Sequence, residues 1–362
     1  MVKTAIQTIS RILGVTVLTG ILNACVTTPE KFEFTMPSNN STAVAPIVWP
    51  EPPEEAHYQY IGDLRGESNK LKSSKDKKSP FQRFFAGLVG MDSEYIPLLD
   101  VLRPQQGVVD KNGRIYVTDP GLQAVFVFDE ITGEFFIWNE KKLNIPFLSP
   151  VGIALTETSV LVSDSEQGLI FEFDLAGNIL RTFGRNALLR PTGIAYDKEK
   201  KRILVSDTDD DNIKVFSLQG KLLKVIGSKG TDPGQFNRPT FIAHQNNKLY
   251  VSDSLNARVQ VFNEEDKPVN SIGQRGLYVG NFSRPKGVAI DSDGNIYVTE
   301  SYYDHLLIFN SVGEFLMSIG GSGNKPGTFS QPTAVWIDDK DRVFVSDMLN
   351  SRVSIFQYLG DK

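Results

Sequence analysis

Short apolar runs separated by polar turns fill the chain from about residue 98 onward, and they recur as a repeating unit. A proline opens each unit, at Pro104, Pro150, Pro191, Pro239, Pro285 and Pro332. The second apolar run of each unit ends in an acid, at Asp119, Asp164, Asp207, Asp253, Glu300 and Asp347, so the acid returns every 43 to 47 residues. A third run follows, five units add a fourth, and helical periodicity is absent. Six radial units of short strands predict an all-β fold, a six-bladed β-propeller over residues 98–362.

The sixth unit has only three strands before Lys362, so a closed ring needs a fourth strand from elsewhere. The segment Tyr-Gln-Tyr-Ile-Gly at 58–62 matches the fourth-strand pattern of residues 224–227, Lys-Val-Ile-Gly. We expect residues 56–66 to pair with the last blade, because this pairing covers two strand edges that would otherwise be open.

Two units carry a more specific signature. Residues 251–259 read Val-Ser-Asp-Ser-Leu-Asn-Ala-Arg-Val and residues 345–353 read Val-Ser-Asp-Met-Leu-Asn-Ser-Arg-Val. This pattern resembles the NHL-repeat family of six-bladed propellers, in which a strand ending in Val-x-Asp precedes an Asn-x-Arg loop. The resemblance implies the propeller fold and says little about activity.

The amino-terminal part has the features of an export signal. A basic start precedes an apolar run over residues 12–22 that is too short for an ordinary membrane span, and Leu-Asn-Ala-Cys follows, ending at Cys25, the sole cysteine. This ending resembles the lipobox of bacterial lipoproteins. We expect residues 1–24 to be a signal peptide, Cys25 to be lipidated, and residues 25–55, rich in proline, serine and threonine, to form a flexible tether. Val26 after the cysteine favours the outer membrane, with the propeller facing the periplasm.

Residues 67–97 connect the closing strand to the first blade. They contain five lysines between positions 70 and 78, followed by an apolar segment rich in phenylalanine. Two interpretations stay open: a solvated loop with a short segment packed on the propeller, or a docking element for anionic lipid or a partner.

Composition excludes several functions. The formal net charge of −5 argues against a wide basic surface for nucleic acid. A single cysteine excludes an intrachain disulfide framework. No phosphate-binding loop or nucleophile elbow is present, so no cofactor is expected. Three histidines are too dispersed for a zinc-dependent propeller lyase, and we expect His244 to be a packed residue that lines the channel.

The recurring acids favour a structural role. One carboxylate per blade, paired with Arg258 or Arg352 where the motif is complete, is best explained as a turn cap and ion pair. The fifth blade departs from the motif, because residues 300–305 read Glu-Ser-Tyr-Tyr-Asp-His. Exposed tyrosines provide large contact areas, so the candidate binding surface comprises Glu300, Tyr302, Tyr303, His305, Arg258 and Arg352. Alternatively, the tyrosines only cover the blade.

The Asp-Thr-Asp-Asp-Asp run beginning at Asp207 has the alternate spacing of calcium loops. Asp207, Asp209 and Asp211 are therefore weak candidate calcium ligands, although the glycine and the glutamate of a complete loop are missing.

These observations favour a lipid-anchored propeller that acts without catalysis as a protein-binding or scaffold module in a bacterial envelope complex. The alternatives are a metal-dependent propeller enzyme, either a lyase or a lactonase, and a protein that binds envelope polysaccharide.

Overall fold

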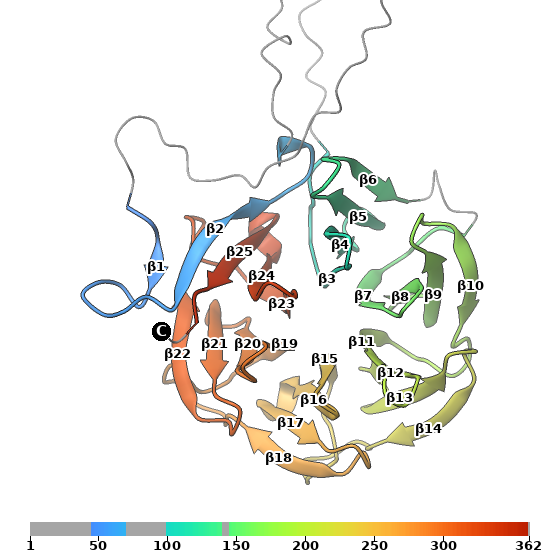
Figure 1. The fold of residues 1–362 in the computed structure, drawn as a ribbon. Helices are drawn as coiled ribbons and strands as arrows, with labels where there is room; N and C mark the ends of the chain where they lie inside the picture. The colour runs from blue at the N-terminus through green and yellow to red at the C-terminus, as the bar shows by residue number, and fades with distance from the viewer. Residues whose placement is uncertain (1–44, 70–98, 140–144, 361–362) are drawn as a thin grey trace, which may run out of the picture.

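A computed structural model describes residues 45–69, 99–139 and 145–360, which form six antiparallel β-sheets around a central axis (Figure 1). Within five of the sheets the strands lie in their sequence order, and the first strands of neighbouring sheets contact one another around the axis. This arrangement confirms the six-bladed β-propeller expected from the repeat.

The strands of the six blades have the following bounds. Blade one contains β3 (Gly107–Val109), β4 (Arg114–Asp119), β5 (Ala124–Asp129) and β6 (Phe135–Trp138). Blade two contains β7 (Pro150–Leu155), β8 (Ser159–Asp164), β9 (Leu169–Asp174) and β10 (Ile179–Phe183). Blade three contains β11 (Pro191–Asp197), β12 (Arg202–Asp207), β13 (Asn212–Ser217) and β14 (Leu222–Ile226). Blade four contains β15 (Pro239–Gln245), β16 (Lys248–Asp253), β17 (Arg258–Phe262) and β18 (Pro268–Ile272). Blade five contains β19 (Pro285–Ile290), β20 (Ile296–Glu300), β21 (His305–Phe309) and β22 (Phe315–Gly320).

Blade six is assembled from both ends of the described chain. It contains β23 (Pro332–Ile337), β24 (Arg342–Asp347) and β25 (Arg352–Tyr358), to which β2 (Tyr58–Leu64) and β1 (Val48–Trp49) add as outer strands. Strand β2 pairs antiparallel with β25, and Figure 1 shows the two strands side by side. The expected closing strand is therefore confirmed. Short 3-10 turns lie at Glu67–Asn69 (η1), Ser254–Asn256 (η3) and Met348–Asn350 (η4).

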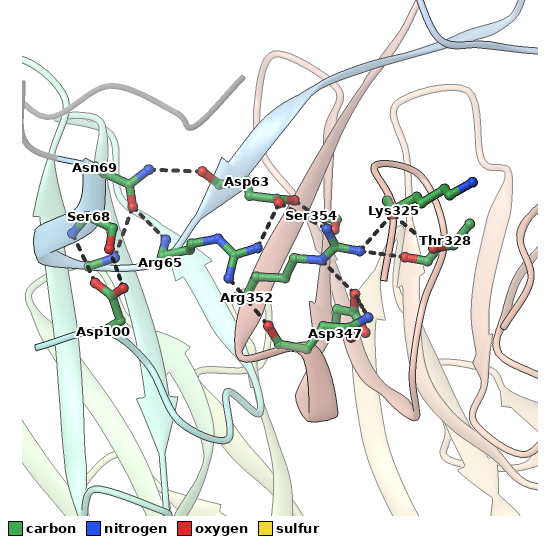
Figure 2. Close-up of polar contacts among 12 residues, drawn as sticks. Asp63, Arg65, Ser68, Asn69, Asp100, Lys325, Thr328, Asp347, Arg352 and Ser354 are labelled. Atoms are coloured by element: carbon green, nitrogen blue, oxygen red, sulfur yellow. Dashed lines mark hydrogen bonds and ion pairs between the residues drawn. The ribbon is translucent and has the colours of Figure 1, made fainter. Parts of the chain in front are cut away.

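A buried ion-pair network fastens the closing strand (Figure 2). The Arg352 side chain is 2% exposed, its Nη1 lies 3.1 Å from Asp63 Oδ2, and its Nε lies 2.7 Å from Asp347 Oδ2. Its Nη2 donates to the backbone carbonyls of Lys325 and Thr328 at 2.9 and 2.8 Å. A single guanidinium thus joins β2, β24 and the loop that leads into blade six.

The described end of the expected tether is folded, which corrects the expectation of a free linker up to residue 55. Val48 and Trp49 pair with β2, and the Trp49 ring packs edge-on against Phe356 with the ring centroids 5.4 Å apart. Because β1 pairs along the outer edge of β2, blade six has five strands where the others have four.

Hydrophobic side chains fill the spaces between neighbouring blades rather than the central axis. Each of six apolar clusters draws residues from two adjacent blades. Strand β2 contributes Tyr58 and Tyr60 to the cluster between blades five and six, and Leu64 to the cluster between blades six and one. The closing strand therefore supports two interfaces, and burial of its side chains is the main force that closes the ring.

Hydroxyl side chains add a polar link between blades. The serine or threonine just before the recurring acid donates to a carbonyl of the next inner strand, as Thr118 does to Val151 at 2.6 Å and Thr299 does to Thr333 at 2.8 Å. Ser163 makes the same bond to Thr192 at 2.6 Å. Ser252 in blade four is the exception among the described residues, because its buried Oγ has no hydrogen-bond partner.

Several expectations fall outside the described residues. These are the signal peptide at 1–24, lipidation of Cys25, the first part of the tether up to residue 44, and the basic linker from residue 70 to 97. Within the described ranges, no helix has the length and apolar character needed to cross a bilayer.

Candidate functional site

The recurring acids act as caps for the loops that enter the inner strands. Asp119 Oδ2 accepts hydrogen bonds from the backbone N–H groups of Leu102 and Arg103 at 2.6 and 3.0 Å. Glu300 Oε2 receives the equivalent pair from Ser283 and Arg284 at 2.8 and 2.9 Å. Burial raises the pKa of Asp119, although the hydrogen bonds from the N–H groups of Arg103 and Leu102 oppose this shift. The recurring acids therefore serve as loop caps, as the sequence pattern suggested.

Arg258 and Arg352 do not contribute to a binding surface, which corrects the candidate set. Arg258 Nε pairs with Asp253 Oδ2 at 2.8 Å, and its Nη2 donates to two carbonyls of the preceding connector, those of Asp232 and Gln235. Arg352 does the same in blade six with Lys325 and Thr328. Each guanidinium fastens the connector that enters its blade, so its charge faces inward.

Blade five lacks this arginine and has a pocket in its place. His305 pairs in register with Glu300, as Arg258 pairs with Asp253 in blade four. The imidazole is shorter than an arginine side chain, and a pocket of about 180 Å³ lies beside it. Glu300 and His305 line the pocket together with Tyr302, Tyr303 and residues 277–281.

The wall of this pocket is an exposed apolar turn. Leu277, Tyr278 and Val279 are 85%, 83% and 60% exposed. The corresponding turns carry polar residues or proline: Thr-Asp-Pro at 231–233 before blade four and Asn-Lys-Pro at 324–326 before blade six. All three turns have the same backbone pairing, a parallel bridge to the phenylalanine that follows the turn. The bridges join Lys229 to Phe236, Arg275 to Phe282 and Ser322 to Phe329. The fold therefore does not require apolar side chains at 277–279.

The tyrosines predicted from the sequence form the opposite wall. Tyr302 is 61% exposed, and its ring meets that of Tyr303 edge to face at a centroid distance of 4.9 Å. Tyr303 and His305 are partly buried, whereas Glu300 is 1% exposed and lies at the base as a loop cap. The structure thus brings together four of the six predicted surface residues and adds residues 277–279, which the sequence analysis missed. Exposed apolar patches of this kind mark sites of interaction.

The acidic loop does not present its carboxylates to a common point. Asp209 pairs with the Arg238 guanidinium at 2.7 Å, while Asp211 Oδ1 accepts the Arg238 backbone N–H at 2.7 Å. Asp207 caps the loop before β11 through the N–H groups of Leu189 and Arg190. The three side chains are therefore engaged with separate groups.

One cluster of possible metal ligands occurs in the described part of the chain, at Asp197, Glu199 and His244. Arg202 occupies this cluster, because its Nε lies 2.7 Å from Asp197 Oδ2. Burial lowers the pKa of His244, and the nearby Asp197 carboxylate partly opposes this shift. A guanidinium beside the ligands repels a metal cation, so we interpret the cluster as an ion-pair network.

A larger cavity of about 500 Å³ opens at the mouth of the channel, where the inner strands begin. Three repeat positions line it: the residue before the opening proline, the residue after that proline, and the residue after the recurring acid. The lining includes Arg190, Arg238 and Arg284 from the first position and Lys286 from the second. No carboxylate or imidazole of the described residues lines it.

Comparisons with known proteins agree with this architecture. Residues 286–360 match a domain family described as a 6-bladed beta-propeller. No curated protein matches the sequence. The solved structures of similar fold include a virginiamycin B lyase from Staphylococcus aureus, which is 12% identical with a TM-score of 0.53 over 71% of this chain and 95% of that chain.

Two structures from Bacteroides thetaiotaomicron are also similar. A protein of unknown function is 14% identical with a TM-score of 0.57, over 71% of this chain and 70% of that one. An auxiliary nutrient binding protein is 11% identical with a TM-score of 0.56, over 72% and 70%. At such identities the likeness concerns the fold alone, and the closer resemblance to NHL repeats stays a prediction. The chain is a six-bladed β-propeller.

Proposed function

We propose that the chain is a non-catalytic binding module that docks a partner protein on the pocket of blade five. The observation that carries this proposal is local: the arginine that fastens the connector in blades four and six is absent in blade five, and the turn beside the resulting pocket is apolar and exposed. Among the three blades that share this connector, blade five alone differs at both places, and we attribute the two differences to a shared ligand.

The chemistry of the pocket favours a protein over a sugar. Its lining combines three tyrosines, at positions 278, 302 and 303, with the aliphatic side chains of Leu277, Val279 and Leu307. A volume of about 180 Å³ suits one apolar side chain of a partner. Tyrosine and leucine around a small central pocket form the type of surface on which a buried anchor residue dominates binding.

The channel offers little support for the alternative of a lyase or lactonase. The described lining of its cavity lacks the carboxylate or imidazole that usually transfers protons in such reactions. The similar structures include both a lyase and a nutrient binding protein, so fold alone does not favour catalysis.

We further propose that Cys25 carries lipid and holds the propeller at the periplasmic face of the envelope, in the outer membrane. The lipobox-like ending of the amino-terminal apolar run supports this proposal. A flexible segment from Cys25 to the folded residues that begin near position 45 would reach about 25 Å, enough to let the blade-five pocket approach a neighbouring protein.

Site-specific photocrosslinking in the native envelope tests the docking proposal. A photoreactive amino acid at position 277 of the full chain should give one defined adduct with another protein, whereas the same group at position 231 should not. The adduct from position 277 should disappear when the two following residues are replaced by those of the blade-four turn, Tyr278→Asp and Val279→Pro, and when Tyr302→Ala and Tyr303→Ala are combined.

The turn replacement is a matched control, because the same residues already occupy this backbone before blade four. Adducts of equal yield from positions 277 and 231, or adducts that survive both sets of substitutions, would contradict docking at blade five. A polysaccharide adduct would favour the carbohydrate-binding alternative.

A further inference from the structure

The channel mouth gathers positive charge in an acidic protein. Arg190, Arg238 and Arg284 occupy the same repeat position in blades three, four and five, and Lys286 lies two residues after the last of them. All four residues line the cavity of about 500 Å³. The chain as a whole has a formal net charge of −5, so this cluster of cations has the opposite sign to the net charge of the protein.

Three of these cations have no counterion among the described residues. Arg238 pairs with Asp209 at 2.7 Å, whereas no described carboxylate lies within ion-pair distance of Arg190, Arg284 or Lys286. Surface cations normally cost little when unpaired. Cations that line one cavity repel one another, and water screens this repulsion least at Lys286, which is half-buried, whereas Arg190 and Arg284 are exposed.

The hydroxyl groups that directly follow the recurring acids in the cavity lining are already committed to the fold. The hydroxyls of Ser165, Thr208 and Ser254 donate to the carbonyls of the prolines that open the next blades, at 2.5, 2.6 and 2.6 Å. They cannot donate to a ligand at the same time. With these hydroxyls engaged, the cationic side chains are the charged donors at the cavity wall.

We propose that the channel mouth binds a small oxyanion, a polycarboxylate or a phosphate with at least two negative charges, held by Arg190, Arg284 and Lys286. Guanidinium groups bind carboxylate and phosphate oxygens in a bidentate manner, and separate cations on blades three and five suit a ligand with separate anionic groups. The cavity has the size of a small-molecule site. This site is independent of the protein-binding pocket on blade five.

The environment of Lys286 supports the proposal. Its burial, and secondarily the neighbouring Arg284 cation, lower the pKa of the ammonium group. A bound anion would favour the charged form of Lys286 and offset both effects. Position 286 is not constrained to be cationic by the repeat, because Val151, Thr192 and Thr240 occupy it in blades two, three and four.

Calorimetric titration of the complete chain with citrate and with pyrophosphate at low ionic strength tests the proposal, with sucrose as an uncharged probe. Binding should saturate at one anion per chain. Arg284→Gln, Arg190→Gln and Lys286→Met should each weaken it about tenfold or more. Arg103→Gln is the matched control, because Arg103 has the same repeat position in blade one but does not line the cavity.

Stronger binding of citrate would identify a carboxylate ligand, and stronger binding of pyrophosphate a phosphate ligand. The proposal is overturned if neither anion saturates, or if Arg103→Gln weakens binding as much as Arg284→Gln, since either result means general screening of surface charge. Unfolding midpoints of all variants exclude misfolding as the cause. Tyr302→Ala combined with Tyr303→Ala should leave anion affinity unchanged, so failure here is distinct from failure of docking at blade five.

Discussion

Blades four and five are built on the same backbone and differ in how their outer loops are fastened. In blade four Arg258 joins Asp253 to the connector carbonyls of Asp232 and Gln235. In blade five His305 takes this position, yet the connector keeps its shape, because the Phe282 N–H still donates to Gln274 at 2.9 Å. The comparison shows that backbone hydrogen bonds and the buried phenylalanine define the connector, whereas the arginine only strengthens it. That position is therefore available for another task.

Blade six shows the other extreme. Arg352 makes the bonds of Arg258 and adds Asp63 from the closing strand, 289 residues away in sequence. The same repeat position thus has three roles: it fastens a connector in blade four, closes the ring in blade six and borders a pocket in blade five.

The largest effect should come from removing the arginine that closes the ring. Arg352→Met leaves Asp347 buried without its cation and Asp63 with only the partly exposed Arg65, and we expect a loss of about 3 to 5 kcal/mol in the free energy of unfolding. Arg258→Met should cost less, about 1 to 2 kcal/mol, because that side chain is 15% exposed and faces one carboxylate. Urea denaturation measures both. Equal losses would mean that the closing strand is held without help from Arg352.

The closing strand was predictable, but the role of its partner was not. Tyr58, Tyr60 and Gly62 repeat a pattern found at the end of other blades, so the sequence indicated both the strand and its blade. Arg352, like Arg258, was correctly expected to pair with the acid of its motif, but it was also placed on a binding surface. Its burial depends on Asp63, and local sequence carries no signal for a contact that long-range pairing creates.

The hydroxyl links between blades provide the next test. Ser163 Oγ donates to Thr192 and accepts from the Gly152 N–H at 2.8 Å, so Ser163→Ala leaves two buried groups without a partner and should cost about 1 to 3 kcal/mol. Ser252 Oγ in blade four makes no such bond, so Ser252→Ala should be neutral or slightly stabilising. Thermal and urea unfolding compare the two. A large loss in Ser252→Ala would contradict the prediction that this hydroxyl contributes no hydrogen bond to the fold.

Converting blade five into blade four sharpens the comparison directly. Glu300→Asp with His305→Arg should restore the guanidinium bonds to the connector, raise the free energy of unfolding by about 1 to 2 kcal/mol and fill the pocket. The yield of the adduct from position 277 should fall about tenfold. The reverse pair, Asp253→Glu with Arg258→His, should lower stability without creating an adduct at position 231. If the blade-five conversion leaves the adduct unchanged, the pocket is not where the partner inserts.

The apolar turn at 277–279 illustrates why half of this site escaped prediction. Leu-Tyr-Val in sequence is indistinguishable from part of a strand, and only its place in the connector shows that it is exposed. Tyr302 and Tyr303 were identified because they replaced residues of a recognisable motif. Residues that break a pattern can be found from sequence, whereas residues that become a surface through folding cannot.

The smallest effect is expected near the carboxyl ends of the inner strands of blades four and five, β15 and β19. His244 in blade four and Ile290 in blade five occupy the same repeat position there. Asp197, Glu199, Arg202 and Asp266 are the charged groups around His244, and burial outweighs their net attraction, so its pKa lies below the ordinary value of 6.5. The unfolded chain then takes up a proton that the folded chain resists, and stability falls as the pH drops through 6.5 toward the folded pKa.

Between about pH 7.5 and about pH 5.5 this proton uptake should cost up to about 1 kcal/mol. His244→Ile, which installs the blade-five residue, should remove that part of the pH dependence while the other two histidines supply an unchanged background. Urea midpoints at both pH values measure the difference. An identical pH dependence in the two chains would mean that the Asp197 carboxylate compensates fully for the burial of His244. The ion-pair network around His244, rather than desolvation, would then control its protonation.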